Sequence, residues 1–178
     1  MLPFLLVIDD EVKREKLKEI YLNYRKLGYW TANKILKDSY EAEDVVQDAI
    51  IKMEPLMHKI EDTNCNKTRA LFVIIVRNLS INIYNKKKNM EDTHYEEIEI
   101  TSKDISLDEK MINLDQAKWM LDMLTKINPA YSDILTLRYY YDYTNSEIAK
   151  VINITEGNVR VRLHRARKSI KKIIEEEI

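Results

Sequence analysis

Basic residues gather in a short stretch near the end of the chain. Positions 155–172 hold seven of them against a single acidic residue, Glu156. The seven are Arg160, Arg162, Arg165, Arg167, Lys168, Lys171 and Lys172. Long cationic side chains donate hydrogen bonds to phosphate oxygens, and arginine also reaches the acceptor edge of guanine. The cluster predicts a polyanionic partner, although the net charge of the whole chain is only −1.

Apolar residues in the same stretch recur at helical spacing. The apolar set is Val159, Leu163, Ala166 and Ile170. The spacing places this set on one face of a helix predicted over 156–176, with a second face opposite to it, since each residue turns the helix by about 100°. The candidate DNA-contacting residues on that second face and its flanks are Gly157, Asn158, Arg160, Val161, Arg162, His164, Arg165 and Lys168.

A shorter helix, predicted over 145–152, precedes the basic one. A three-residue turn, Asn153 to Thr155, separates the two, and Thr155 is placed to cap the second helix. In a helix-turn-helix the second helix enters the major groove of DNA with its N-terminal end first. Gly157 is less favourable than alanine in a helix by up to ~1 kcal/mol, and close contact between backbone and DNA is a reason to keep it. The pattern predicts a DNA-binding helix-turn-helix over 124–174; the alternative is a solvated basic helix on a bundle.

The composition of the whole chain predicts an all-α fold. The 178 residues include only two glycines and three prolines, whereas the tight turns of a sheet usually need many. Helical periodicity predicts helices over 12–36, with a break at Gly28, over 41–54, which ends at Pro55, and over 68–86. A polar loop is expected over 61–67.

The character of the chain changes after this first helical bundle. Residues 91–110 carry eight acidic residues against two lysines and show no sustained period, which is typical of a linker. Helical periodicity resumes at Leu114 and includes a boundary at Pro129. We therefore expect a helical domain over 1–88, an acidic linker over 89–112 and a helix-turn-helix domain over 113–178.

The sequence offers no pattern typical of an enzyme. Its potential metal ligands are scattered: His58, His94, His164 and Cys65. We find no glycine-rich phosphate loop and no convincing pair of nucleophile and base, so we expect neither catalysis nor a cofactor. The apolar run over 2–8 is far shorter than the ~20 residues of a membrane span and lacks the features of a signal peptide. It predicts an arm packed on the first bundle of a cytoplasmic protein, without membrane insertion.

Three segments resemble the extracytoplasmic-function (ECF) type of bacterial sigma factor. SEIAKVINITEGNVRVRLHRARKSIKKI, at 146–173, resembles the promoter-binding region 4 of that family. ILKDSYEAEDVVQDAIIKM, at 35–53, resembles the conserved part of region 2, and RNLSINIYNKKK, at 77–88, is similar to the end of that region. The resemblance covers about 17–88 and 114–176, and the two regions stand in the family's order on either side of an acidic linker.

The resemblance implies core RNA polymerase and promoter DNA as partners. Polymerase contacts would involve the β′ clamp helices and the β flap, and an anti-sigma factor would be a further partner. In the family, the helix that matches 41–54 docks on the clamp helices. The residues carried over to that contact are Asp44, Gln47 and Asp48, with Ile51 as an exposed apolar neighbour. By their chemistry alone, these residues form an acidic strip that is more often simply solvated.

The resemblance also implies a reader of the −10 promoter element in the first domain. In the family, the helix that matches 68–86 and the loop before it trap a base flipped out of the non-template strand. The carried-over candidates are Asp62, Asn64, Asn66, Arg77, Asn78, Asn82, Lys86, Lys87 and Lys88. Asn78, Asn82 and Asn85 form a stripe of poor helix formers on this helix. The sequence departs from the family at Leu71, where a tryptophan is common, and at Ile74, where a basic residue is common.

Together these features predict an alternative sigma factor that reads −35 and −10 elements. The residues alone leave two other classes of protein open. A stand-alone helix-turn-helix repressor or activator would usually be a dimer on a two-fold site. A helical adaptor that binds only protein would show no salt-dependent affinity for DNA.

Overall fold

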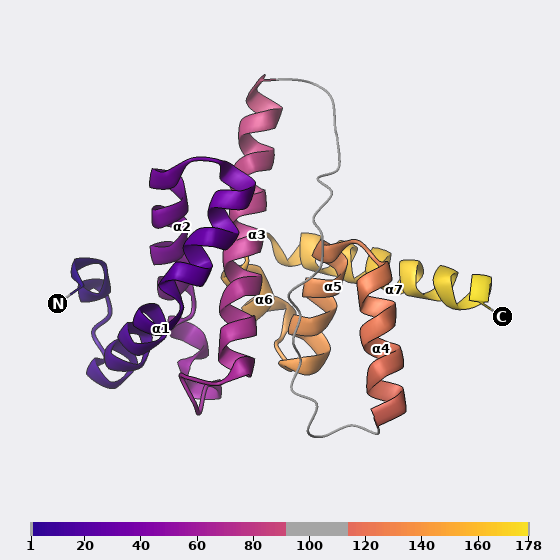
Figure 1. Ribbon diagram of the computed structural model, residues 1–178, viewed down its shortest axis with the longest axis horizontal. Helices are drawn as coiled ribbons and strands as arrows, with labels where there is room; N and C mark the ends of the chain where they lie inside the picture. The colour runs from indigo at the N-terminus through magenta and orange to yellow at the C-terminus, as the bar shows by residue number, and fades with distance from the viewer. Residues whose placement is uncertain (1, 92–113, 178) are drawn as a thin grey trace. The chain divides into compact units, whose positions relative to one another are not determined.

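A computed structural model describes residues 2–91 and 114–177, and Figure 1 shows helices joined by turns. No β-strand occurs in these two ranges, which confirms the all-α prediction. The chain divides into two compact units: an N-terminal unit built on the helices of 2–91, and a C-terminal unit built mainly on the helices of 114–177. Two helical domains were expected, and two helical units are found.

The N-terminal unit consists of three long helices and two short 3-10 turns. Its elements are η1 (Pro3–Val7), α1 (Glu11–Leu36), α2 (Ser39–Lys52), η2 (Glu54–Lys59) and α3 (Asn66–Glu91). Each of the three α-helices packs on the other two. The Asp38 side chain caps α2 by accepting from the backbone N–H of Glu41 at 3.0 Å, as expected of an N-cap aspartate. Because α3 continues to Glu91, it extends past the predicted boundary at residue 88, and the remaining residues of the predicted linker lie outside the described ranges.

Gly28 does not break the first helix, so that prediction was wrong. α1 runs through it, and Gly28 is buried. A Cβ atom at this position would lie 2.7 Å from Cε1 of Phe72 and 3.1 Å from Cγ2 of Val46. Glycine is therefore needed here for the close approach of α1 to α2 and α3. The stability gained by this packing outweighs the ~1 kcal/mol by which glycine disfavours a helix.

The predicted apolar stripes form the core of the N-terminal unit. The expected stripe of α2 is fully buried: Ala42, Val45, Val46, Ala49 and Met53. On α3, every residue over 71–80 is buried. This range includes Leu71 and Ile74, so apolar core side chains stand at the two positions where the sequence departs from the family.

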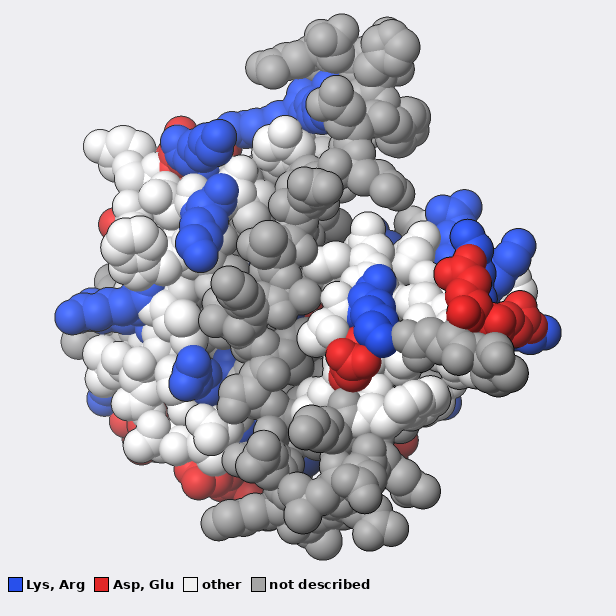
Figure 2. Space-filling view, turned by 45° about the vertical axis from the view of Figure 1, so that its right-hand side comes forward, with Lys and Arg blue, Asp and Glu red and all other residues white. Residues whose placement is uncertain are grey.

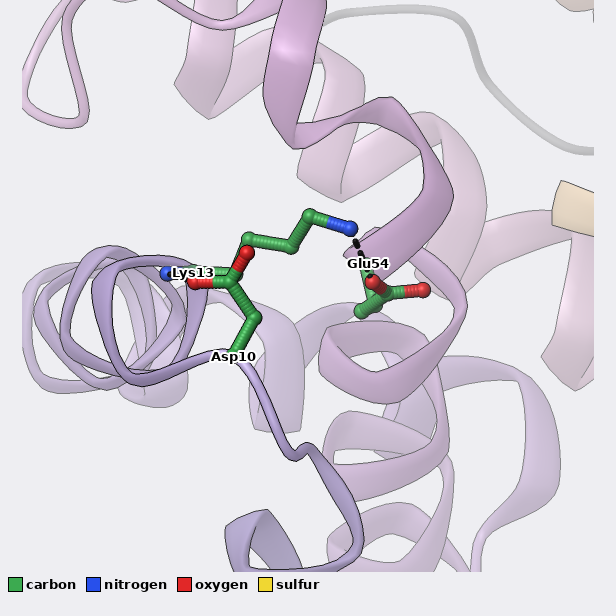
Figure 3. Close-up of polar contacts among 3 residues, drawn as sticks. All are labelled: Asp10, Lys13 and Glu54. Atoms are coloured by element: carbon green, nitrogen blue, oxygen red, sulfur yellow. Dashed lines mark hydrogen bonds and ion pairs between the residues drawn. The ribbon is translucent and has the colours of Figure 1, made fainter.

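The N-terminal arm packs on α1, as expected. Leu5 and Ile8 are buried, and the ring of Phe4 meets that of Tyr21 edge-on at a centroid distance of 5.1 Å. Farther along, the start of α1 is joined to η2, where Lys13 Nζ lies 2.5 Å from Glu54 Oε1 (Figure 3). The hydrogen bond to Glu54 raises the pKa of Lys13.

The C-terminal unit contains four α-helices and one π-helical turn. Its elements are α4 (Leu114–Lys126), α5 (Pro129–Leu135), η3 (Thr136–Tyr140), α6 (Asn145–Val151) and α7 (Glu156–Glu177). The Asn128 side chain caps α5 with Pro129 in its first turn, as the sequence indicated. The buried ring of Tyr143 stacks on that of Tyr141 at 5.6 Å, and Arg138 donates to the carbonyl oxygen of Tyr143 at 2.8 Å. These contacts fix the chain where it enters α6.

Candidate nucleic-acid interfaces

Local hydrogen bonds fix the geometry of the helix-turn-helix. Thr144 and Glu147 form a capping box at the start of α6: the Glu147 N–H donates to Thr144 Oγ1 at 3.2 Å and the Thr144 N–H to Glu147 Oε2 at 2.8 Å. Asn153 follows α6 in the left-handed conformation, with φ at 57°, and the next N–H, of Ile154, donates back to Ala149 at 3.0 Å. The hydroxyl of Thr155 then accepts from the Asn158 N–H at 3.2 Å. The predicted cap and turn are confirmed.

The two faces of α7 differ as the spacing predicted. Val159, Leu163 and Ala166 are buried, and Ile170 is half-buried. Seven of the eight candidate DNA-contacting residues are exposed: Gly157, Asn158, Arg160, Val161, His164, Arg165 and Lys168. The eighth, Arg162, is half-buried, and burial lowers its pKa. The face thus combines cations with an apolar side chain, because Val161 is 46% exposed.

Acidic neighbours reduce the positive charge at both ends of α7. Arg160 lies 3.8 Å from Glu156 in the first turn. Near the other end, Lys171 and Lys172 each pair with a glutamate four residues later at 3.6 Å. In Figure 2, basic and acidic side chains lie next to each other on the right-hand side.

The positive charge of α7 is therefore least compensated in its middle. Within the described residues, Arg165 and Lys168 form no ion pair with an acidic side chain. Arg167, on another side of the helix, donates to the hydroxyl of Tyr139 at 3.1 Å. Arg165 and Lys168 are the cations on the candidate face best placed to meet a polyanion.

The candidate strip on α2 faces away from the core of its unit. Asp44 and Asp48 are exposed, while Gln47 and Ile51 are half-buried. Ile51 was expected to be exposed, and this is only partly correct, because its side chain is half-buried. Spacings of three and four residues place all four side chains on one side of α2. They form a small acidic surface with the apolar side chain of Ile51 at one end.

The loop before α3 exposes the predicted side chains of Asp62 and Asn64, and the third, Asn66, is exposed as the first residue of α3. The loop is tightly turned, because Asp62 Oδ1 accepts from the backbone N–H of Asn64 at 2.8 Å. The Thr68 hydroxyl also donates to the carbonyl oxygen of Asp62, at 2.5 Å. These bonds give the loop a defined conformation.

The other −10 candidates are spread along α3 and differ in exposure. Arg77 and Asn78 are only 6% and 2% exposed, and the Asn78 amide donates to the carbonyl oxygen of Ile74 at 2.9 Å. Asn82 and Lys88 are half-buried, and Lys86 is exposed. Lys87 is exposed as well, and its Nζ lies 2.6 Å from Glu41 Oε1 at the start of α2. The asparagine stripe therefore turns partly inward.

The structure does not bring the loop and the lysine run together. Asn66 and Lys86 are twenty residues apart on one helix, which at 1.5 Å per residue separates them by about 30 Å. Successive phosphates of one B-form strand are about 3.4 Å apart along the axis. One nucleic acid that touched both groups would extend over several nucleotides.

Sequence reasoning missed the α1 residues that contact the loop. Thr63 Oγ1 donates to Glu19 Oε2 at 2.6 Å, and the Tyr24 hydroxyl lies 3.3 Å from the carbonyl oxygen of Cys65. Each contact joins residues about 40 positions apart, and no motif marks them. Only the packing of α1 on the loop reveals them.

The described ranges contain neither a candidate metal site nor a candidate membrane span. No group of three or more His, Cys, Asp or Glu residues in these ranges could hold a metal ion. His94, one of the scattered potential ligands, lies outside them. None of the helices in these ranges has both the length and the apolar character needed to cross a membrane.

Comparisons with known proteins match both units. The family model described as Sigma-70 region 2 matches residues 20–90, and the one described as Sigma-70, region 4 matches residues 117–170. The ECF RNA polymerase sigma factor SigW of Bacillus subtilis is 23% identical over 162 residues, which cover 84% of this chain and 83% of that protein. SigL of Mycobacterium tuberculosis is 23% identical over 160 residues, covering 90% of this chain and 89% of SigL. SigX of Bacillus subtilis is 21% identical over 166 residues, covering 90% and 84%.

Proposed function

The chain belongs to the ECF group of the sigma-70 family, alternative sigma factors that direct transcription initiation, and we propose that it reads a promoter with both of its units. In this proposal α7 reads the −35 element as duplex DNA. The loop before α3, together with α3 itself, reads the −10 element and helps to melt it. The protein is not itself an enzyme, because the polymerase carries out the chemistry.

The observation that carries the −35 assignment is the exposed face of α7. This helix follows a capped turn, buries one side in its own unit and presents Arg165, Lys168 and Val161 on the other. Arginine and lysine match phosphates and guanine acceptors, whereas an exposed valine matches the methyl group of thymine. Gly157 opens the helix without a side chain, and only Thr155 Oγ1, at 3.7 Å, lies near the position of a Cβ. The DNA backbone would approach closely there.

The −10 assignment is supported by the exposed polar loop and the lysines on α3. Asp62, Asn64 and Asn66 offer hydrogen-bonding groups for a single base, and Lys86 offers charge for phosphates about 30 Å away. Arg77 and Asn78 are buried, so we propose that they contact DNA only after the surroundings of α3 open.

The α2 strip is the proposed docking site for core RNA polymerase. Asp44 and Asp48 would pair with basic groups of the β′ clamp helices, and Ile51 would add an apolar contact at the end of the strip. The C-terminal unit would contact the β flap, and the acidic linker expected over 89–112 would tether the two units. We place the protein in the cytoplasm with its polymerase, and an anti-sigma factor is a further proposed partner.

Run-off transcription with core polymerase on a library of genomic fragments tests the function as a whole. The proposal expects new start sites that depend on the added protein, and a protein that is monomeric by gel filtration before it binds polymerase. If no new start sites and no association with core polymerase were found, the sigma function would be refuted. A dimer that binds two-fold DNA sites without polymerase would instead indicate a repressor or activator.

Replacing Asp44 with alanine is expected to weaken binding to core polymerase and leave duplex −35 binding intact. The reason is that Asp44 lies on α2, in the other unit from α7. Core affinity can be measured by fluorescence anisotropy of the labelled full chain. Glu15→Ala on α1 is the matched control, because it removes the same charge from an exposed position outside the strip. Unchanged core affinity in the Asp44 variant would contradict the docking site.

Replacing Arg165 with alanine is expected to weaken −35 binding by ~1–3 kcal/mol if the guanidinium reads a base. The loss should be confined to promoters that carry the preferred base at one position. Binding of the polymerase complex to a panel of −35 duplexes measures this selectivity. Lys171→Ala is the control, since that lysine is paired with Glu175 near the far end of α7. An equal loss on every duplex would reduce Arg165 to a phosphate contact.

A further inference from the structure

Three residues at successive positions along α1 form hydrogen bonds with the loop before α3. Lys16 Nζ donates to the carbonyl oxygen of Ile60 at 3.2 Å, and Thr63 Oγ1 donates to Glu19 at 2.6 Å. The Tyr24 hydroxyl donates to the carbonyl oxygen of Cys65 at 3.3 Å. The residues of α1 and the loop residues that they contact follow the same order along the chain. These hydrogen bonds hold the loop along the surface of α1.

The shortest of these contacts decides which loop side chains face outward. Thr63 is 8% exposed, and its hydroxyl donates to the carboxylate of Glu19, whereas Asp62 and Asn64 on either side of it are exposed. A hydrogen bond to a carboxylate is stronger than one between neutral groups. Fixing Thr63 inward therefore helps to keep its two neighbours outward, where a ligand can reach them.

The contact with Tyr24 affects which hydrogen-bonding groups of Asn64 are available to a ligand. Tyr24 is buried against Phe72, with ring centroids 6.3 Å apart, and burial raises the pKa of its hydroxyl. A phenol hydroxyl is protonated at neutral pH and can donate a hydrogen bond. The single proton of this hydroxyl is shared between the carbonyl oxygen of Cys65 and Asn64 Oδ1, which lie 3.3 and 3.4 Å from the hydroxyl oxygen. With Oδ1 facing a donor, the Asn64 amide keeps its Nδ2–H groups for another partner. Those groups match a base that offers an acceptor, such as a carbonyl oxygen.

We propose that Glu19 and Tyr24 are positioning residues that set which base the loop selects. The inference rests on the proposed function of the loop as a reader of the −10 element. Glu19 fixes the direction of the loop side chains through Thr63. Tyr24 fixes the orientation of the Asn64 amide, so that the loop favours a base with an acceptor at the contacted edge.

The test measures base preference as well as activity. Core polymerase with each full-length variant transcribes a promoter library randomised across the −10 element, and sequencing of the transcripts gives the preference at every position. Thr63→Val and Tyr24→Phe are each expected to reduce the preference at one −10 position about three- to tenfold, as expected for the loss of one hydrogen bond. Thr63→Ser keeps the hydroxyl and should restore the preference. Tyr21→Phe is the matched control, the same change one turn earlier on α1.

The outcomes separate the inference from the function on which it rests. If the wild-type protein selects bases in the −10 element and both variants keep its preference at every position, the positioning role is refuted, even where total activity falls. If the wild-type protein shows no preference in the −10 element, the proposed reading of that element fails, and the inference fails with it. A Thr63→Ser variant that behaves like Thr63→Val would also overturn the role of the hydroxyl.

Discussion

Replacing Phe72 with alanine is expected to lower the free energy of unfolding of the N-terminal unit by about 3–5 kcal/mol. Phe72 is fully buried on α3, and its ring contacts Tyr24 and closely approaches the backbone of Gly28. Removing the ring leaves a cavity where the three helices meet. Hydrogen exchange of the full chain, followed by mass spectrometry, measures the effect, because peptides of α1 to α3 report on this unit separately from those of α5 to α7.

A second substitution tests whether Gly28 is present because of that ring. Alone, Gly28→Ala places a Cβ 2.7 Å from Cε1 of Phe72, and such overpacking typically costs about 1–3 kcal/mol. In the Phe72→Ala background the contact with the ring is gone and the milder one, 3.1 Å from Cγ2 of Val46, remains, while alanine favours a helix over glycine by ~1 kcal/mol. The same change should therefore destabilise the wild-type protein clearly more than the Phe72→Ala variant. Equal effects in both backgrounds would show that the close approach does not determine the residue.

The error at Gly28 shows where sequence periodicity is insufficient. Apolar spacing correctly predicted the buried stripe of α2 and the two faces of α7, because each depends on residues within one helix. A glycine within such a pattern has two physical explanations, a break in the helix or a close neighbour. The neighbour here is Phe72, 44 positions away in the sequence. Only the packing of the helices distinguishes the two explanations.

The candidate sites also divide into features set by residues close in sequence and features set by packing between helices. The cap by Thr155, the turn and the exposed face of the helix-turn-helix were predicted, because they depend on residues close in sequence. The capping box of Thr144 with Glu147 is equally local but was not predicted. The family resemblance assigned binding sites to the loop and to α2. Their residue types alone indicated only a polar surface. Neither approach indicated that Asn78 turns inward or that Lys87 pairs with Glu41, because both depend on how α3 packs in its unit.

The pairing of Lys87 with Glu41 also links two of the proposed functions. Glu41 stands in the first turn of α2, and Lys87 belongs to the basic run of α3. Glu41 is half-buried, and its Oε2 is buried without a hydrogen-bond partner among the described residues, so a phosphate that drew Lys87 away would leave this carboxylate poorly compensated.

Replacing Leu163 with alanine is expected to destabilise the C-terminal unit by about 2–5 kcal/mol and thereby to weaken −35 binding. Leu163 is buried on the inner face of α7, where its side chain holds the helix against the rest of the unit. Hydrogen exchange of α7 peptides in the full chain should rise, while that of α1 to α3 stays unchanged.

Val161→Ala, two residues earlier on the same helix, separates stability from recognition. Val161 is 46% exposed, so its truncation should change stability by no more than about 0.5 kcal/mol. If Val161 contacts the methyl group of a thymine, the variant should still lose affinity, and only for −35 duplexes that carry that thymine. Selective loss without increased exchange assigns the outer face of α7 to DNA. A Val161 variant with wild-type affinity on every duplex would remove this residue from the interface, and a Leu163 variant with wild-type exchange would contradict the packing of α7.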